Sequence, residues 1–183
     1  MIMNINIEEE LQKEISSALD EHWAGAPNHP KVLARSIYRI VNSRIDEIQK
    51  TLPEKYIFTI VISYTDTYDK TVKKLIKMLR EIEAYIKIIL TSPETEANYE
   101  SAEVNNADIY IDLNDQIEDE DYFDRFINQK ETTLIIGIGF ASIPDTHILN
   151  KINHSFYLIT NDDIKQIFLQ EYVYNLVMND YLM

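Results

Sequence analysis

Hydrophobic residues recur at helical spacing in the first part of this chain, and short apolar runs begin after about residue 55. Residues 7–19 and about 31–50 carry apolar side chains at helical spacing. A segment with two prolines and a glycine, residues 23–30, separates them and predicts a turn or short linker. We therefore expect an N-terminal helical extension, residues 1–52, built from two helices.

Five short apolar runs, rich in β-branched residues, follow this extension and alternate with helical segments. The runs span residues 56–63, 86–90, 108–112, 133–138 and 156–159, and the intervening helices are expected at about 70–84, 121–129, from 145 and from 162. Strands separated by helices form parallel sheets through right-handed crossovers. Residues 53–183 are thus predicted to form an α/β domain, a Rossmann-like three-layer sandwich with about five mostly parallel strands.

Composition and charge narrow the class of protein. The chain has no cysteine, which excludes disulfides, thiolate zinc sites and cysteine nucleophiles. It also has no run of about 20 apolar residues that would span a bilayer, and its N-terminus lacks the basic start of a signal peptide. These features favour a soluble, cytoplasmic protein that does not insert into a membrane.

The net charge of −14 is unevenly distributed, because residues 1–87 are neutral and residues 88–183 hold all of it. Phosphate backbones are bound by clustered Lys and Arg, so the acidic half argues against a nucleic-acid partner. The segment Lys70–Arg80 alternates basic and apolar residues. It is interpreted as a solvated helix face, with a basic docking strip as the alternative.

Ligands of open parallel sheets bind beyond the carboxyl ends of the strands. The expected ligand-binding residues at these ends are Ser63, Thr65, Asp66, Asn114, Asp115, Gly137, Gly139 and Ser142. The strand ends contain hydroxyl and acidic groups but no Lys or Arg, which disfavours a phosphate ligand. Gly137-Ile-Gly139 is the nearest approach to a phosphate loop; close packing of the backbone is the alternative that we favour.

No motif of this sequence assembles a catalytic or metal-binding constellation. The acidic run 118–121 lacks the glycine and spacing of a calcium loop, and is expected to be a solvated helix start. The histidines of each pair, 22 with 29 and 147 with 154, are seven residues apart, too far for a helical zinc site. A Gly-x-Ser-x-Gly elbow is missing as well. We predict no catalytic residues, no metal and no cofactor.

Aromatic residues near both chain ends, Trp23 and Tyr172 among them, have two interpretations. They could pack terminal helices onto the sheet, or form an exposed patch that binds a protein partner. The expected final helix also carries an apolar stripe, which must be buried against the sheet or against another protein. A protein partner or a homo-oligomer is therefore expected.

Three segments carry a resemblance to a known family: Asp108-Ile-Tyr-Ile-Asp-Leu-Asn-Asp115, Leu134-Ile-Ile-Gly-Ile-Gly139 and Phe156-Tyr-Leu-Ile-Thr-Asn-Asp-Asp163. Residues 108–183 resemble the second Rossmann-like half of GT-B glycosyltransferases, and in particular the degenerate glycosyltransferase-like proteins of the accessory Sec export system. The paired glutamates and basic residues with which active transferases grip the donor have no counterpart here. The resemblance therefore implies a non-catalytic relative.

Two functions follow from these observations. The first, which we favour, is a non-catalytic accessory or protein-interaction module on a Rossmann-like domain, in protein export or glycosylation if the resemblance holds. The second is a protein or enzyme that binds a small molecule, such as a nucleotide or nucleotide sugar, at the carboxyl ends of the strands.

Overall fold

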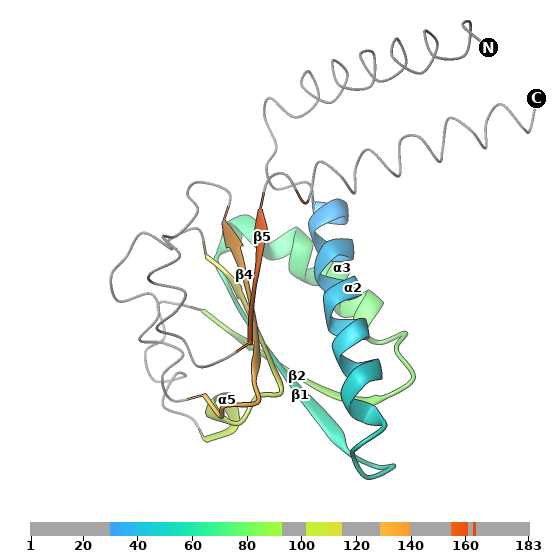
Figure 1. Cartoon of the computed structure of the whole chain (residues 1–183). Coiled ribbons are helices and arrows are strands. Elements are labelled where there is room, and N and C mark those ends of the chain that lie inside the picture. Colours follow the sequence, from blue (N-terminus) through green and yellow to red (C-terminus); the bar gives the residue numbers. More distant parts are fainter. Residues whose placement is uncertain (1–29, 93–101, 115–128, 140–154, 161–162, 164–183) are drawn as a thin grey trace, which may run out of the picture.

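The computed structural model describes residues 30–92, 102–114, 129–139, 155–160 and 163 (Figure 1). These residues contain five strands, interleaved with helices, as the sequence predicts. The elements are α2 (Pro30–Gln49), β1 (Ile57–Tyr64), the 3-10 turn η1 (Asp66–Tyr68), α3 (Asp69–Leu79), β2 (Tyr85–Thr91), α5 (Ala102–Asn105), β3 (Ile109–Leu113), β4 (Leu134–Gly139) and β5 (Ser155–Thr160). The protein is an α/β protein.

The five strands form one all-parallel sheet in the order β2-β1-β3-β4-β5. The chain runs from β1 outward to β2 and then returns to place β3 on the other side of β1. The direction of winding therefore reverses between β1 and β3. The carboxyl ends of these two strands form the topological switch point, where open α/β sheets bind ligands. The arrangement is that of a Rossmann-like sheet.

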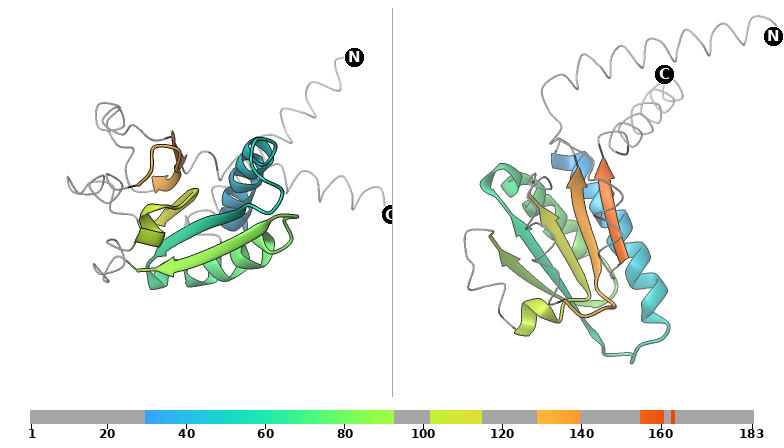
Figure 2. Two further views of the ribbon diagram at one scale, coloured as in Figure 1. Left: turned by 90° about the horizontal axis from the view of Figure 1, so that it is seen from below. Right: turned by 60° about the vertical axis from the view of Figure 1, so that its left-hand side comes forward.

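Helices α2 and α3 lie side by side on one face of the sheet (Figures 1 and 2). Both are amphipathic, and their buried stripes join the strands in the larger hydrophobic core. For example, Ile37 of α2 and Leu75 of α3 share this core with Ile62 and Ile136 of the strands, and all four are completely buried. Truncation of such a side chain to alanine costs about 2–5 kcal/mol, so this core contributes strongly to stability.

The opposite face of the sheet carries a smaller core. Val61, Tyr110 and Ile135 of three adjacent strands pack there with Val104 of the short helix α5. Helical residues therefore lie against both faces of the sheet in the described part of the chain, most of them on the face of α2 and α3. Within that part, no helix is long and apolar enough to cross a membrane.

Helix α3 is shorter than the sequence predicts: it ends at Leu79 and not near residue 84. The backbone N–H groups of Glu81 and Ile82 bond three residues back, to Met78 and Leu79, so the last turn tightens. Ile82 packs against the larger core from this turn and not from a helix. The chain can then enter β2 at Tyr85.

Several predictions fall on residues outside the described part of the chain. These are the helices near 7–19 and 145, all of the helix 121–129 except Gln129, most of the final helix, and the aromatic residues Trp23 and Tyr172. Gln129 itself is buried and lies in a bend, not in a helix. Asp163 is helical, and it exchanges hydrogen bonds with Thr160 in the manner of a capping box. The domain boundary at residue 52 stays a prediction.

Candidate functional site

Four polar side chains gather at the switch point, on the sheet face opposite α2 and α3. Strand register places Ser63 of β1 between Thr91 of β2 and Asp112 of β3, and Asn114 follows Asp112 by two residues. Side chains two residues apart on a strand share a face. These four residues therefore continue the face that carries Val61, and replace its apolar surface with hydroxyl, carboxylate and amide groups.

Hydrogen bonds join the two sides of the switch point. The Asn114 amide Nδ2 donates to Ser63 Oγ at 3.4 Å and also to Asp112 Oδ1. All four residues are buried, with at most 5% of their surface exposed. Two of their atoms, Thr91 Oγ1 and Asn114 Oδ1, have no hydrogen-bond partner in the described part of the structure. Such atoms are uncommon in folded proteins, and this cluster is the candidate site.

Gly137 lies beside the Asp112 end of this cluster. It lies within β4, opposite Asp112 of β3 and Leu158 of β5, and is buried. Its backbone is part of the ladder, and the described glycines have no positive φ. The first glycine of Gly137-Ile-Gly139 is therefore inside a strand, and what it contributes is the lack of a side chain next to the Asp112 carboxylate. Gly139 ends β4 and pairs with Thr160.

The structure brings some of the predicted ligand-binding residues together and separates others. Ser63 and Asn114 meet in the cluster, whereas Thr65 is the N-cap of η1 and Asp66 is an exposed residue of its first turn. Asp115 and Ser142 lie outside the described residues. Thr91 and Asp112 belong to the cluster but were not predicted as ligand-binding residues. The signal for Asp112 was a carboxylate inside an apolar run, which is costly to bury without a role.

A second polar cluster surrounds Asp108, at the amino end of β3. Asp108 Oδ1 accepts hydrogen bonds from the Tyr56 hydroxyl at 2.8 Å and from Lys130 Nζ at 2.7 Å, and Oδ2 accepts the Thr59 backbone N–H at 2.8 Å. Burial, reinforced by the bond and the charge of Asp108, raises the pKa of Tyr56 to about 12. Both carboxylate oxygens are satisfied, so this cluster ties β1, β3 and the start of β4 together.

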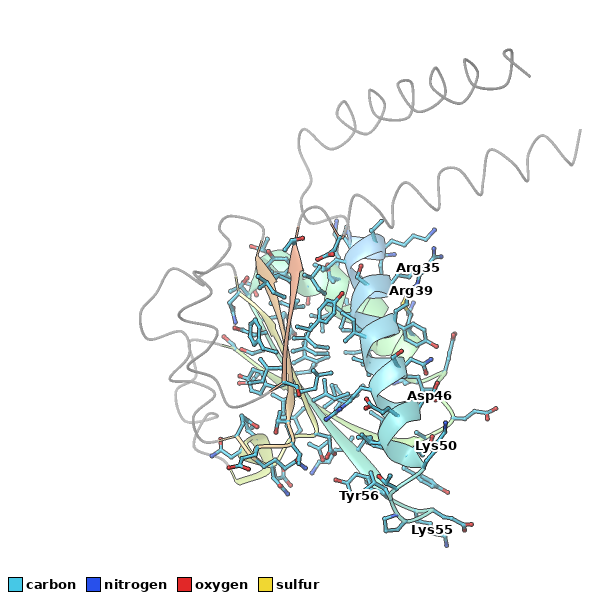
Figure 3. The ribbon with its side chains drawn as sticks, in the orientation of Figure 1. Arg35, Arg39, Asp46, Lys50, Lys55 and Tyr56 are labelled. Atoms are coloured by element: carbon cyan, nitrogen blue, oxygen red, sulfur yellow. The ribbon has the colours of Figure 1, made fainter. Side chains whose placement is uncertain are left out.

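The helical layer over the larger core is cationic. Helices α2 and α3 carry eight Lys and Arg against three Asp and Glu, a net charge of +5, while the rest of the chain carries −19. Figure 3 shows Arg35 and Arg39 along the outer side of α2. The Lys70–Arg80 segment lies in the same layer, because α3 packs beside α2. We call the outward surface of α2 and α3 the cationic layer.

A groove lies between α2 and the β4–β5 edge, next to the cationic layer. Its apolar lining is Ile40, Leu134 and Tyr157, and its charged lining is Arg39, Arg44 and Glu47. Tyr157 is 45% exposed. Arg44 bonds the backbone carbonyl of Thr132 and the Glu47 carboxylate, both at 3.3 Å, which fixes its guanidinium at the groove wall.

The chemistry available to the described residues is limited. Among them, no group of three or more His, Cys, Asp or Glu side chains could hold a metal ion. The switch-point cluster has one carboxylate, one amide and two hydroxyls, a set that binds ligands by hydrogen bonds. Comparisons of the chain with protein-family models, curated proteins and solved structures found no match.

Proposed function

We propose that this protein is a non-catalytic protein-interaction module, and that the cationic layer with its adjoining groove receives an acidic protein partner. One observation carries this proposal: α2 and α3 gather a charge of +5 on a single face of a chain whose net charge is −14. A segregated charge of this kind steers a complementary surface and fixes its orientation.

The groove supplies the contacts that charge alone does not. Tyr and Arg are enriched where interfaces concentrate their binding energy, and here exposed Tyr157 lies with Arg39 and Arg44 around an apolar floor. A partner with an acidic segment that carries one or two apolar side chains fits both the floor and the rim. Nucleic acid fits less well, because the −19 on the rest of the chain opposes a second polyanion.

Affinity capture with surface variants tests this proposal. Wild-type protein, the double variant Arg39→Glu/Tyr157→Ala, and Lys55→Glu are compared by quantitative mass spectrometry of bound proteins. Lys55 is an exposed lysine on neither helix, so its charge reversal is the matched control. We expect a partner with an acidic surface to fall by at least about ten-fold with the double variant only, since loss of such contacts exceeds 1.4 kcal/mol.

Reconstitution of that partner with the purified variants must reproduce the difference. Equal capture of every protein by all three would contradict the proposal, and so would material that disappears on nuclease treatment. The resemblance of residues 108–183 to glycosyltransferase-like proteins of the accessory Sec system directs the search to partners in protein export or glycosylation. The parallel sheet is compatible with that resemblance.

The switch-point cluster favours a second candidate function, the binding of a small neutral or hydroxyl-rich molecule. Thr91 Oγ1 and Asn114 Oδ1 are buried at the switch point without a described partner; Ser63 lies beside Thr91 in the sheet and accepts a hydrogen bond from Asn114. A sugar or nucleoside hydroxyl could satisfy both atoms. A ligand at 100 times its dissociation constant adds about 2.7 kcal/mol to stability. A panel of sugars, nucleosides and nucleotide sugars that leaves the melting temperature unchanged would count against this candidate.

A further inference from the structure

We propose that a pocket at the amino-terminal edge of the sheet binds an organic cation of the alkylammonium class. The pocket lies at the opposite edge from the switch point, and the proposal depends neither on that cluster nor on the cationic layer. Its volume is about 350 Å³, within the range of small-molecule pockets. It is lined by Gln49, Pro53, Glu54, Tyr56, Phe58, Ile82, Glu83, Ala84 and Tyr85.

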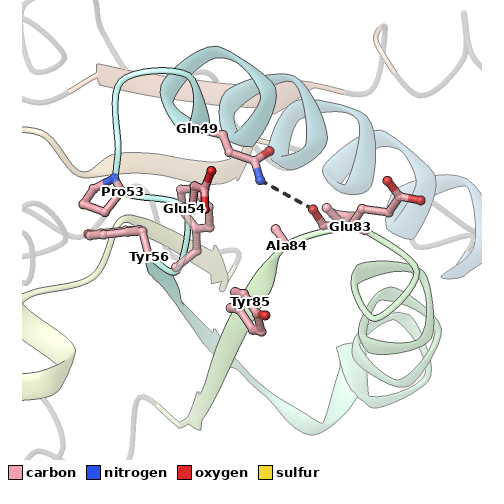
Figure 4. A pocket seen from close by; sticks show the side chains of 9 residues that line it. Gln49, Pro53, Glu54, Tyr56, Glu83, Ala84 and Tyr85 are labelled. Atoms are coloured by element: carbon pink, nitrogen blue, oxygen red, sulfur yellow. Dashed lines mark hydrogen bonds between the residues drawn. The ribbon is translucent and has the colours of Figure 1, made fainter.

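The charge of the lining selects a cation. Glu54 and Glu83 are both exposed at the pocket, and none of the nine lining residues is Lys or Arg. Figure 4 shows that the two glutamates come from different segments, one from the loop before β1 and the other from the turn before β2. The Glu54 side chain lies beside Gln49, whereas the Glu83 side chain extends outward from its backbone carbonyl (Figure 4). With no cation in the lining, the two carboxylates give the pocket a negative potential, which repels an anion and attracts a positive group.

The aromatic residues of the lining select a soft, weakly hydrated cation. Tyr56, Phe58 and Tyr85 line one small pocket; Tyr85 is 60% exposed and Tyr56 is partly exposed, whereas Phe58 is buried beneath the surface. Aromatic faces attract ammonium groups electrostatically, and alkylated ammonium ions lose little hydration when they make this contact. An apolar ligand would meet the same rings but would gain nothing from the glutamates.

Hydrogen bonds hold the walls in place before a ligand arrives. The Tyr56 ring packs edge-to-face on Phe58, with centroids 5.1 Å apart, and its hydroxyl bonds Asp108 at 2.8 Å. The Tyr56 N–H bonds the Pro53 carbonyl at 3.0 Å, and Gln49 Nε2 bonds the Glu83 carbonyl at 3.5 Å (Figure 4). Pre-organised walls reduce the ordering that binding requires.

NMR titration of the full chain with choline tests the proposal. The reporters are the methyl groups of Ile82 and Ala84, which line the pocket, and 3,3-dimethylbutan-1-ol serves as the neutral isostere. We expect choline to bind with a dissociation constant of about 1 mM and the isostere at least about five-fold more weakly. Equal binding of the two, or no shift of the reporters at about 50 mM choline, would overturn the proposal.

Variants of exposed residues attribute the binding to the pocket. Tyr85→Ala should weaken choline binding by about five-fold, whereas Tyr85→Phe keeps the ring and should bind as the wild type does. Leu90→Ala removes an exposed side chain of the same strand that does not line the pocket, and is the control. Unchanged binding in Tyr85→Ala, with the thermal stability of the wild type, would also overturn the proposal.

A tripeptide with a central trimethyllysine distinguishes two sources of the cation. Tighter binding of the tripeptide than of choline assigns the pocket to a basic side chain of another protein. Binding no tighter than that of choline assigns it to a free small molecule. Both results keep the alkylammonium group as the recognised chemistry.

Discussion

An aspartate lies at each end of β3, and the two aspartates have different surroundings. Asp108 precedes the amino end, and its two oxygens accept three hydrogen bonds, from Tyr56, Lys130 and the Thr59 backbone. Asp112 lies near the carboxyl end, bonded by Asn114, in a cluster where two buried polar atoms have no described partner. The hydrogen bonds at the amino end stabilise the fold. At the carboxyl end, buried polar atoms have no described partner and can accept a hydrogen bond from a ligand or donate one to it.

This difference agrees with the general division of labour in open parallel sheets. Ligands bind at the carboxyl ends of the strands, so the polar groups there can form hydrogen bonds to a ligand and not only to one another. Polar groups at the amino ends hold the strands in register. The contrast within a single strand shows that the position of an aspartate in the sheet, and not its burial, separates the two roles.

The largest expected effect comes from Asp108→Ala, which breaks the amino-end cluster. The substitution leaves the Tyr56 hydroxyl, Lys130 and the Thr59 N–H without their acceptor, and should lower the free energy of unfolding by about 3 kcal/mol. Urea denaturation measures this loss. Glu103→Ala breaks the exposed pair with Lys87 and should change stability by less than about 0.5 kcal/mol. Equal effects of the two substitutions would contradict a structural role for Asp108.

A matched pair of threonine substitutions compares the two ends directly. Thr133, at the amino end of β4, donates to the Ala107 carbonyl at 2.7 Å, whereas Thr91 Oγ1 at the carboxyl end of β2 has no described partner. Thr133→Val should therefore cost about 1 kcal/mol, and Thr91→Val should add up to about 1 kcal/mol because it removes an unsatisfied buried hydroxyl. Urea denaturation of both variants measures the two signs. A loss of stability in both variants would contradict the difference between the two ends of the sheet.

The last prediction concerns the pH dependence that Tyr56 gives to the amino end. Its pKa is raised from 10 to about 12 in the folded protein, so the unfolded chain loses this proton first as the pH rises. The resulting stabilisation is complete below pH 10 and is lost between pH 10 and 12. Tyr56→Phe should lower stability at neutral pH and flatten its decline over that interval. Identical slopes in wild type and variant would contradict the assigned pKa.

The strands and the larger helices could be predicted from the sequence because their signals are local. Runs such as Ile57–Tyr64 are apolar and β-branched, and α2 begins one residue before its predicted start at Lys31. The end of α3 was missed because Ile82 fits the helical spacing but reaches the core from a tight turn. The spacing of apolar residues predicts which residues are buried, but it does not distinguish a helix from a tight turn.

The candidate site was predicted only in part because it depends on strand order. Ser63 and Asn114 were expected from their positions after apolar runs, and the structure joins them by a hydrogen bond. Their neighbours Thr91 and Asp112 became evident only when β1 was placed between β2 and β3. The cationic layer likewise required the finding that α2 and α3 share a face. Neither the strand order nor the shared face of α2 and α3 can be predicted from the spacing of residues along the chain.

The strand order also describes how the sheet could grow as the chain leaves the ribosome. After β1 and β2 have paired, each later strand joins the edge formed by the previous outermost strand: β3 joins β1, β4 joins β3, and β5 joins β4. Synthesis delivers residues from the N-terminus, so every new strand would find a finished template. After β1 has formed, no strand has to be inserted between two strands that have already paired. At each stage, the next strand pairs with one exposed edge of the growing sheet.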